Sequence, residues 1–105
     1  MNYQTAALYA GVLKAAAHPM RVRIIDELRQ GDRCVRDLAA LGTINQSNVS
    51  RHLATLEKAG IISGKRHLTK VIYHLESPEI LDIFQPAAQV AKRDINRRKA
   101  KGRDL

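Results

Sequence analysis

The fold of this chain is decided by residues 46–58, which read QSNVSRHLATLEK. At 100° per residue, Val49, Leu53 and Leu56 fall on one face of a helix, and that face must be buried. The opposite face carries short polar side chains and an arginine, where most solvent-exposed helices carry Glu and Lys. Within this helix no acidic residue occurs before Glu57, so this face does not repel phosphate. The pattern indicates a helix that places its polar face in the major groove of DNA.

Reading base edges in the major groove requires hydrogen-bonding side chains near the N-terminus of such a helix. The helix N-terminus also attracts phosphate through its dipole. The alternative is an ordinary amphipathic surface helix. Helix stability alone would not explain why its exposed face is rich in Gln, Ser and Asn, which are not the strongest helix formers. His52 is placed on the half-buried flank, closer to phosphate than to bases. We expect DNA contacts from Gln46, Ser47, Asn48, Ser50, Arg51 and His52.

A second short helix precedes this one across a tight turn. Apolar residues share one face of a helix over 35–41, and residues 42–45 form the turn. Asn45 can cap the following helix, which runs from 46 to 59 and is ended by Gly60. Two helices joined in this way predict a helix-turn-helix unit.

A β-hairpin is predicted directly after this unit. Two β-branched runs, at 61–62 and 71–75, lie a few residues apart with a basic segment between them. We expect Lys65, Arg66 and Lys70 to lie on or near the hairpin tip and to contact DNA phosphates. The predicted fold is therefore mainly α with a small β-hairpin wing, a winged helix-turn-helix.

Three further helices flank the predicted DNA-binding unit. The first covers 4–17, the second begins at Pro19 and ends at Gly31, and the last begins at Pro78. Pro86 should kink or break the last helix just before its own position. The first and last helices carry more Ala, Leu and Ile than a small monomer leaves in water, so we expect them to form a homodimer interface.

Length and charge limit the possibilities further. The 105 residues are expected to form one domain, 1–105, with a net charge of +8. Five of those charges sit in the basic C-terminal segment 92–105, either as a solvated helix end or as a phosphate-touching extension. Aromatic residues make up 4%, too few for stacking platforms that bind single strands.

Several classes of protein are disfavoured. No grouping of a nucleophile with a base, or of paired carboxylates, suggests an enzyme. No apolar stretch is long enough to span a membrane, and the N-terminus does not look like a secretory signal. A protein–protein module would need an exposed apolar patch on the recognition helix, which 46–52 lack. We expect a cytoplasmic protein.

Five stretches together carry a family pattern: Ala17–Ile25, Cys34–Ala39, Asn45–Leu53, Ala59–Ile62 and Val71–Leu75. They resemble the arsenic-repressor/SmtB (ArsR/SmtB) family of dimeric winged-helix repressors. The resemblance implies a two-fold dimer formed by the first and last helices, with one recognition helix from each protomer on a palindromic operator. It also implies repression that is lifted when a metal, metalloid or other inducer alters the dimer.

The family's metal sites do not carry over to this chain. The family's thiolate site reads Cys-Val-Cys-Asp, whereas this chain reads Cys34-Val35-Arg36-Asp37, with a guanidinium in place of the second thiolate. The family's other site needs histidine from the last helix, and 79–105 contain none. We expect no metal and no cofactor. Cys34 is either a small buried residue or a redox-responsive thiol. Leu68 stands at the wing tip, where the family usually has Gly.

We therefore expect a sequence-specific, DNA-binding transcriptional regulator, a dimeric repressor released by an inducer of unknown identity. Its partners are double-stranded DNA and a second copy of itself. The alternative is a non-inducible or architectural DNA-binding protein without a sensory site, which would show weak sequence discrimination.

Overall fold

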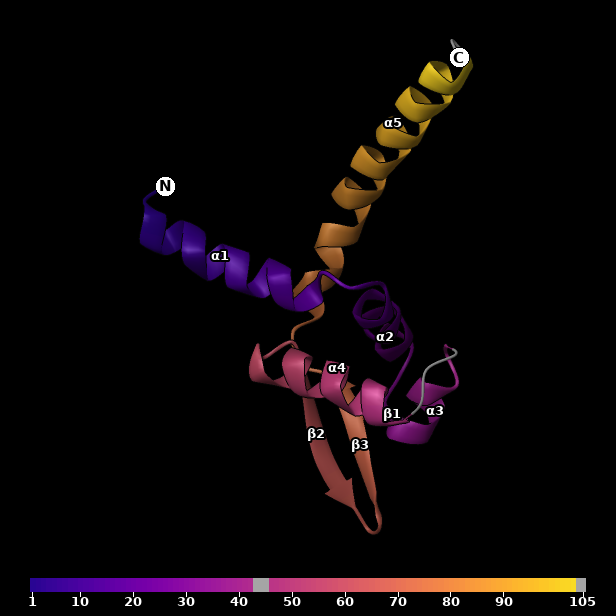
Figure 1. Ribbon diagram of the computed structural model, residues 1–105. Coiled ribbons are helices and arrows are strands. Elements are labelled where there is room, and N and C mark those ends of the chain that lie inside the picture. The colour runs from indigo at the N-terminus through magenta and orange to yellow at the C-terminus, as the bar shows by residue number, and fades with distance from the viewer. Residues whose placement is uncertain (43–45, 104–105) are drawn as a thin grey trace.

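The structure is a computed structural model that describes residues 1–42 and 46–103. Its elements follow the predicted order, so the winged helix-turn-helix is confirmed (Figure 1). The elements are α1 (Tyr3–Ala16), α2 (Pro19–Arg29), β1 (Arg33–Cys34), α3 (Val35–Ala39), α4 (Gln46–Lys58), β2 (Ile62–His67), β3 (Lys70–Leu75), the 3-10 helix η1 (Pro78–Ile83) and α5 (Phe84–Arg103).

The core lies between α2, α3, α4 and the sheet. The predicted apolar face of α4 is confirmed, because Val49, Leu53 and Leu56 are all 0% exposed. They pack with Ile24 of α2 and Leu38 of α3, which are equally buried. Full burial of each such side chain contributes about 1.5–3 kcal/mol, so this packing sets the orientation of α4 relative to α2 and α3.

The wing is a three-stranded antiparallel sheet in the order β1-β3-β2. Cys34 of β1 pairs with Ile72 of β3, whose other neighbour is Lys65 of β2. The hairpin turns at Leu68, which has a φ of 58° and is 84% exposed. This left-handed backbone conformation favours glycine, which explains physically why the family usually has Gly at the wing tip.

Two predicted helices differ in the structure. The helix predicted over 35–41 ends at Ala39. The last helix is divided, because η1 precedes an α-helix that starts at Phe84. Pro86 therefore lies in the first turn of α5, where backbone N–H groups have no acceptor within the helix, so the missing N–H of proline costs no hydrogen bond. The predicted break before Pro86 is confirmed, but the proline stands near a helix start and not at a kink. The turn residues 43–45, with the predicted Asn45 cap, lie outside the described residues.

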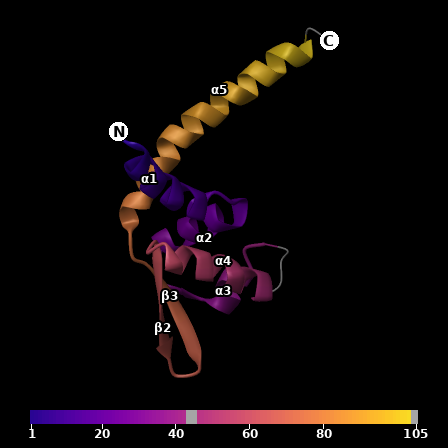
Figure 2. The same cartoon turned by 60° about the vertical axis from the view of Figure 1, so that its left-hand side comes forward.

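The helices α1 and α5 project from the rest of the molecule, on the side away from the hairpin tip (Figures 1 and 2). Their apolar side chains are exposed, with Leu8 at 72%, Val90 at 58% and Ile95 at 51%. In the basic segment, the Asp94 carboxylate pairs with Arg97 and, at 3.0 Å, with Arg98. Among the described helices, none is long and apolar enough to cross a membrane.

Candidate nucleic-acid interface

The recognition helix α4 presents one polar face to solvent. Ser50 and Arg51 are exposed on it. Gln46, Ser47 and Asn48 belong to the first turn of α4; the side chain of Asn48 is half-buried, and those of Gln46 and Ser47 lie outside the described part of the chain. The hydroxyl of Thr55 donates a hydrogen bond to the Arg51 carbonyl at 3.1 Å, one turn back along the helix. Of the predicted base-reading side chains that the structure describes, Ser50 and Arg51 are exposed and Asn48 is half-buried.

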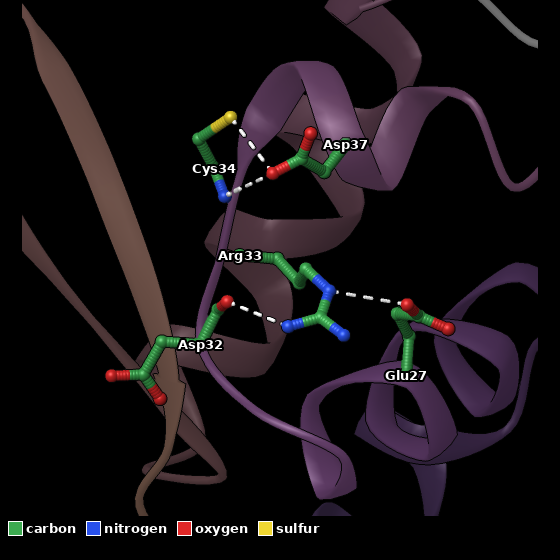
Figure 3. A network of polar contacts seen from close by, with 5 residues as sticks. All are labelled: Glu27, Asp32, Arg33, Cys34 and Asp37. Carbon is green, nitrogen blue, oxygen red and sulfur yellow. Dashed lines mark hydrogen bonds and ion pairs between the residues drawn. The ribbon is translucent and has the colours of Figure 1, made fainter.

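The N-terminus of α3 and the preceding strand β1 carry a local hydrogen-bond network (Figure 3). The Asp37 carboxylate accepts hydrogen bonds from the Cys34 backbone N–H at 3.4 Å and from the Cys34 thiol at 3.2 Å. These bonds, the thiol bond first, lower the pKa of Asp37. The guanidinium of Arg33 donates to Glu27 at 3.1 Å and to the Asp32 carbonyl at 2.9 Å, which ties β1 to α2.

The wing carries the second group of predicted DNA-binding residues. Lys65 and Arg66 of β2 and Lys70 of β3 are all exposed. The register places Arg66 opposite Val71, one step from the tip pair His67 and Lys70. Adjacent residues of a strand point to opposite faces, so Lys65 and Arg66 extend to different sides of the hairpin. The wing thus offers positive charge on both faces near its tip.

A histidine pair joins α4 to the start of α2, and the sequence did not predict it. The rings of His18 and His52 lie 4.3 Å apart between centroids. Arg21 donates from Nε to Nδ1 of His52 at 3.1 Å. Burial, followed by the nearby charges of His18, Arg21 and Arg51, lowers the pKa of His52. The half-buried position predicted for His52 is confirmed. Its contact with His18 was not predicted, and the only hint in the sequence is that His18 directly precedes Pro19, at the start of a predicted helix.

Comparisons with known proteins identify the family. The model of a family described as "Bacterial regulatory protein, arsR family" matches residues 18–63. Rv0081, an uncharacterized HTH-type transcriptional regulator of Mycobacterium tuberculosis, is 33% identical over 99 residues, which cover 93% of this chain and 87% of the relative. This chain belongs to the ArsR family. As an ArsR-family member it is a DNA-binding transcriptional regulator and not an enzyme.

Solved structures share the ArsR-family fold. The crystal structure of Rv0081 matches with a TM-score of 0.75 and 30% identity, covering 92% of this chain and 98% of that one. A homodimeric winged helix-turn-helix DNA-binding domain of a possible ArsR-family regulator from Mycobacterium bovis matches with a TM-score of 0.72 and 27% identity, covering 92% and 93%. The M. tuberculosis repressor SmtB is 35% identical over 83 residues, which cover 79% of this chain and 62% of SmtB.

The residues present do not fit the thiolate site of the ArsR family. Cys34 is 9% exposed, and its thiol donates to Asp37. Arg36, which stands where the family has its second cysteine, is exposed and cationic. Within residues 1–42 and 46–103, no three His, Cys, Asp or Glu side chains lie close enough to hold a metal ion. Cys34 is thus a buried residue at the start of α3, and a redox role for it stays a prediction.

Proposed function

We propose that this ArsR-family protein is a dimeric, sequence-specific repressor of transcription that binds a palindromic operator. One observation carries the proposal: α4 has a fully buried apolar face and, opposite it, an exposed face with Ser50 and Arg51. Short polar side chains and an arginine can hydrogen-bond to base edges, and the buried face holds them in a fixed direction. The whole chain, 1–105, is proposed to act as one domain in the cytoplasm, where bacterial DNA lies.

The wing supports binding without selecting the sequence. Lys65, Arg66 and Lys70 are exposed cations at the end of a hairpin next to α4. Binding of such side chains to phosphates supplies affinity and sets the register on the duplex, while hydrogen bonds to bases supply specificity. We assign base reading to Gln46, Ser47, Asn48, Ser50 and Arg51, and a phosphate-side position to His52.

The dimer is proposed to form through α1 and α5. Leu8, Val12 and Leu13 of α1 and Val90 and Ile95 of α5 are between 41% and 72% exposed in a single chain. A second copy would cover these side chains, and the M. bovis relative is described as homodimeric. A two-fold dimer would present two α4 helices about 34 Å apart, one turn of the duplex, so the operator should be a palindrome.

Repression and release by an inducer are the remaining parts of the proposal. The relative SmtB is described as a repressor, which supports repression over activation. The alternative, an architectural protein that coats DNA, would bind most sequences alike.

An in vitro selection from a random duplex library tests the proposal. A selected palindrome that binds at least about 10³-fold more tightly than a scrambled duplex is expected of a specific regulator. Binding of the two duplexes within a few-fold of each other would favour the architectural alternative. A reporter gene behind the selected palindrome would then show repression directly.

A further inference from the structure

One arginine makes hydrogen bonds to both α1 and α4, two helices that also lie in direct contact. Arg21 of α2 donates from Nη1 to the Ala15 carbonyl at 2.9 Å and to the Lys14 carbonyl at 3.4 Å, both at the C-terminal end of α1. From Nε it donates to Nδ1 of His52 on α4 at 3.1 Å. A cation at a helix C-terminus also complements the helix dipole. Arg21 therefore adds a polar link between α1 and the recognition helix to the direct packing of the two helices.

Both histidines of this junction accept a hydrogen bond at Nδ1. Nδ1 of His18 accepts a hydrogen bond from the Met20 backbone N–H at 3.0 Å, and Nδ1 of His52 accepts from Arg21. Because the guanidinium of Arg21 can only donate, Nδ1 of His52 carries no proton in this arrangement, and the neutral ring carries its proton on Nε2. A second proton on His52 would remove the acceptor of Arg21 and place two cations against each other.

The charged groups around the junction do not stabilise a charged His52. Apart from His18, the described neighbours that act on its pKa by charge are the cations Arg21 and Arg51. The only charged side chain of α1 is Lys14. The acids of α2, Asp26 and Glu27, lie further along that helix and pair with Arg29 and Arg33. On α4, Glu57 comes more than one turn after His52.

We propose that Arg21 is a positioning residue that couples α1 to the recognition helix through His52, and that protonation of His52 releases this coupling. The inference rests on the proposed function, because α1 is taken as part of the dimer interface and α4 as the DNA reader. Release changes the angle at which each protomer presents α4. Operator binding, which needs both α4 helices in register, is weakened more than binding to any other duplex.

The direction of the pH effect separates this coupling from ordinary electrostatics. Protonation of histidines near phosphates strengthens binding to every duplex as the pH falls. Release of the coupling lowers the preference for the operator over a scrambled duplex. The folded-state pKa of His52 is below its ordinary value of 6.5, so the neutral junction is complete above pH 6.5 and is lost as the pH falls through the folded pKa.

The experiment measures the ratio of Kd values for scrambled and selected duplexes, at pH 7.5 and pH 5.5 and at constant ionic strength. In the unmodified protein this ratio should fall on acidification by about 5-fold or more, the lower end of common coupling between sites. In His52→Asn, which keeps an acceptor at the δ position but does not titrate, the ratio should be equal at both pH values. A constant ratio in the unmodified protein, or an equal fall in His52→Asn, overturns the proposal.

Two arginine variants provide a matched comparison. Arg21→Met should lower the ratio at pH 7.5 to near its acid value, with little further change on acidification. Arg23→Met removes the same charge from an exposed position in the same helix and should keep the full pH response. Equal behaviour of the two variants contradicts a positioning role for Arg21.

A measurement without DNA distinguishes failure of the coupling from failure of the proposed function. If no duplex is preferred at any pH, the proposed function fails. The coupling between His52 and α1 is then measured without DNA, by NMR. Backbone amide shifts of Lys14 and Ala15 should then follow the titration of the His52 ring, and should stop following it in Arg21→Met. If the amide shifts of Lys14 and Ala15 do not change as the His52 ring is protonated, the proposed coupling is wrong, whatever the outcome for DNA binding.

Discussion

The body of the molecule, α2 to β3, and its two arms, α1 and α5, use apolar residues in opposite ways. In the body, Ile25 and Leu53 are 0% exposed and pack within one chain. In the arms, Leu8 is 72% and Val90 is 58% exposed. The body can therefore define its own shape, while the arms need a partner surface. The orientation of α4 toward DNA is therefore a property of the single chain. The distance between the two α4 helices is a property of the proposed dimer.

The largest effect is expected from a cavity in the body. Leu53→Ala should lower the free energy of unfolding by about 2–5 kcal/mol, because the site is fully buried and cannot collapse easily. Leu8→Ala removes the same atoms from an arm and should change the unfolding of a single chain by no more than about 0.5 kcal/mol. Urea unfolding at several protein concentrations checks both values. Similar decreases at low concentration would show that the arms fold as part of the body.

Disrupting the proposed dimer surfaces of α1 and α5 should leave the body of each chain folded. Leu13→Glu combined with Val90→Glu places charge on both proposed dimer surfaces, so sedimentation at micromolar concentration should show a monomer. Without the second reader, binding to the palindrome should weaken by about 10²–10⁴-fold. Leu68→Glu, at an apolar and still more exposed position on the wing, should leave the mass unchanged. A monomeric mass for the unmodified protein would contradict the proposed dimer and the palindrome together.

The same contrast explains what the sequence could predict. The helical period from 46 to 58 alone located α4 within one residue of its observed end at Lys58, because a one-sided apolar stripe is a local signal. Gly60, with a φ of 77°, follows the end of that helix as predicted. Ser50 and Arg51 were placed on the exposed face by the same arithmetic.

Features that depend on long-range packing were missed. His18 and His52 are 34 residues apart and meet only because α2 packs on α4, so their spacing in the sequence carried no signal. The break before Pro86 was predicted, but the 3-10 geometry of Pro78–Ile83 was not, since this segment shares one apolar stripe with α5. For Leu68 the family resemblance indicated a departure, but only the backbone angle shows its physical consequence.

Base reading should be confined to the body. Arg51→Ala should cost about 1–3 kcal/mol at the selected operator if its guanidinium binds a base, and much less on a scrambled duplex. Lys58→Ala removes an exposed cation from the far end of the same helix and serves as the control. Fluorescence anisotropy with both duplexes gives the comparison. Equal effects on the two duplexes for Arg51→Ala would reassign this residue to phosphate.

Phosphate binding should belong to the wing and not to the basic arm. Lys65→Gln with Arg66→Gln should flatten the dependence of log K on log salt by up to about 0.9 for each phosphate that is no longer neutralised. Lys92→Gln with Arg93→Gln removes the same charge from α5, which points away from the hairpin tip, and should leave the slope nearly unchanged (Figure 1). A larger change for the α5 pair would place the basic arm on DNA.

The smallest effect is expected at the one place where the body resembles the arms. Leu68 is even more exposed than Leu8 or Val90 of the arms, and its φ of 58° gives it a conformational cost that they do not have. A left-handed conformation costs a non-glycine residue about 1–2 kcal/mol, while the greater freedom of glycine in the unfolded chain offsets about 0.5–1 kcal/mol. Leu68→Gly should therefore raise the free energy of unfolding by up to about 1 kcal/mol, as measured by urea unfolding.

The neighbouring residue provides the control for this small gain. Thr69 does not share the positive φ of Leu68, so Thr69→Gly should gain no relief and should lower stability by about 0.5–1 kcal/mol. Because Leu68 lies outside the proposed dimer surface, Leu68→Gly should also leave the sedimentation mass unchanged, unlike the charge substitutions in the arms. A stability change of the same sign and size in both glycine variants would show that the wing tip carries no backbone strain. The exposure of Leu68 would then have to be explained as that of the arms is, by a partner that covers it.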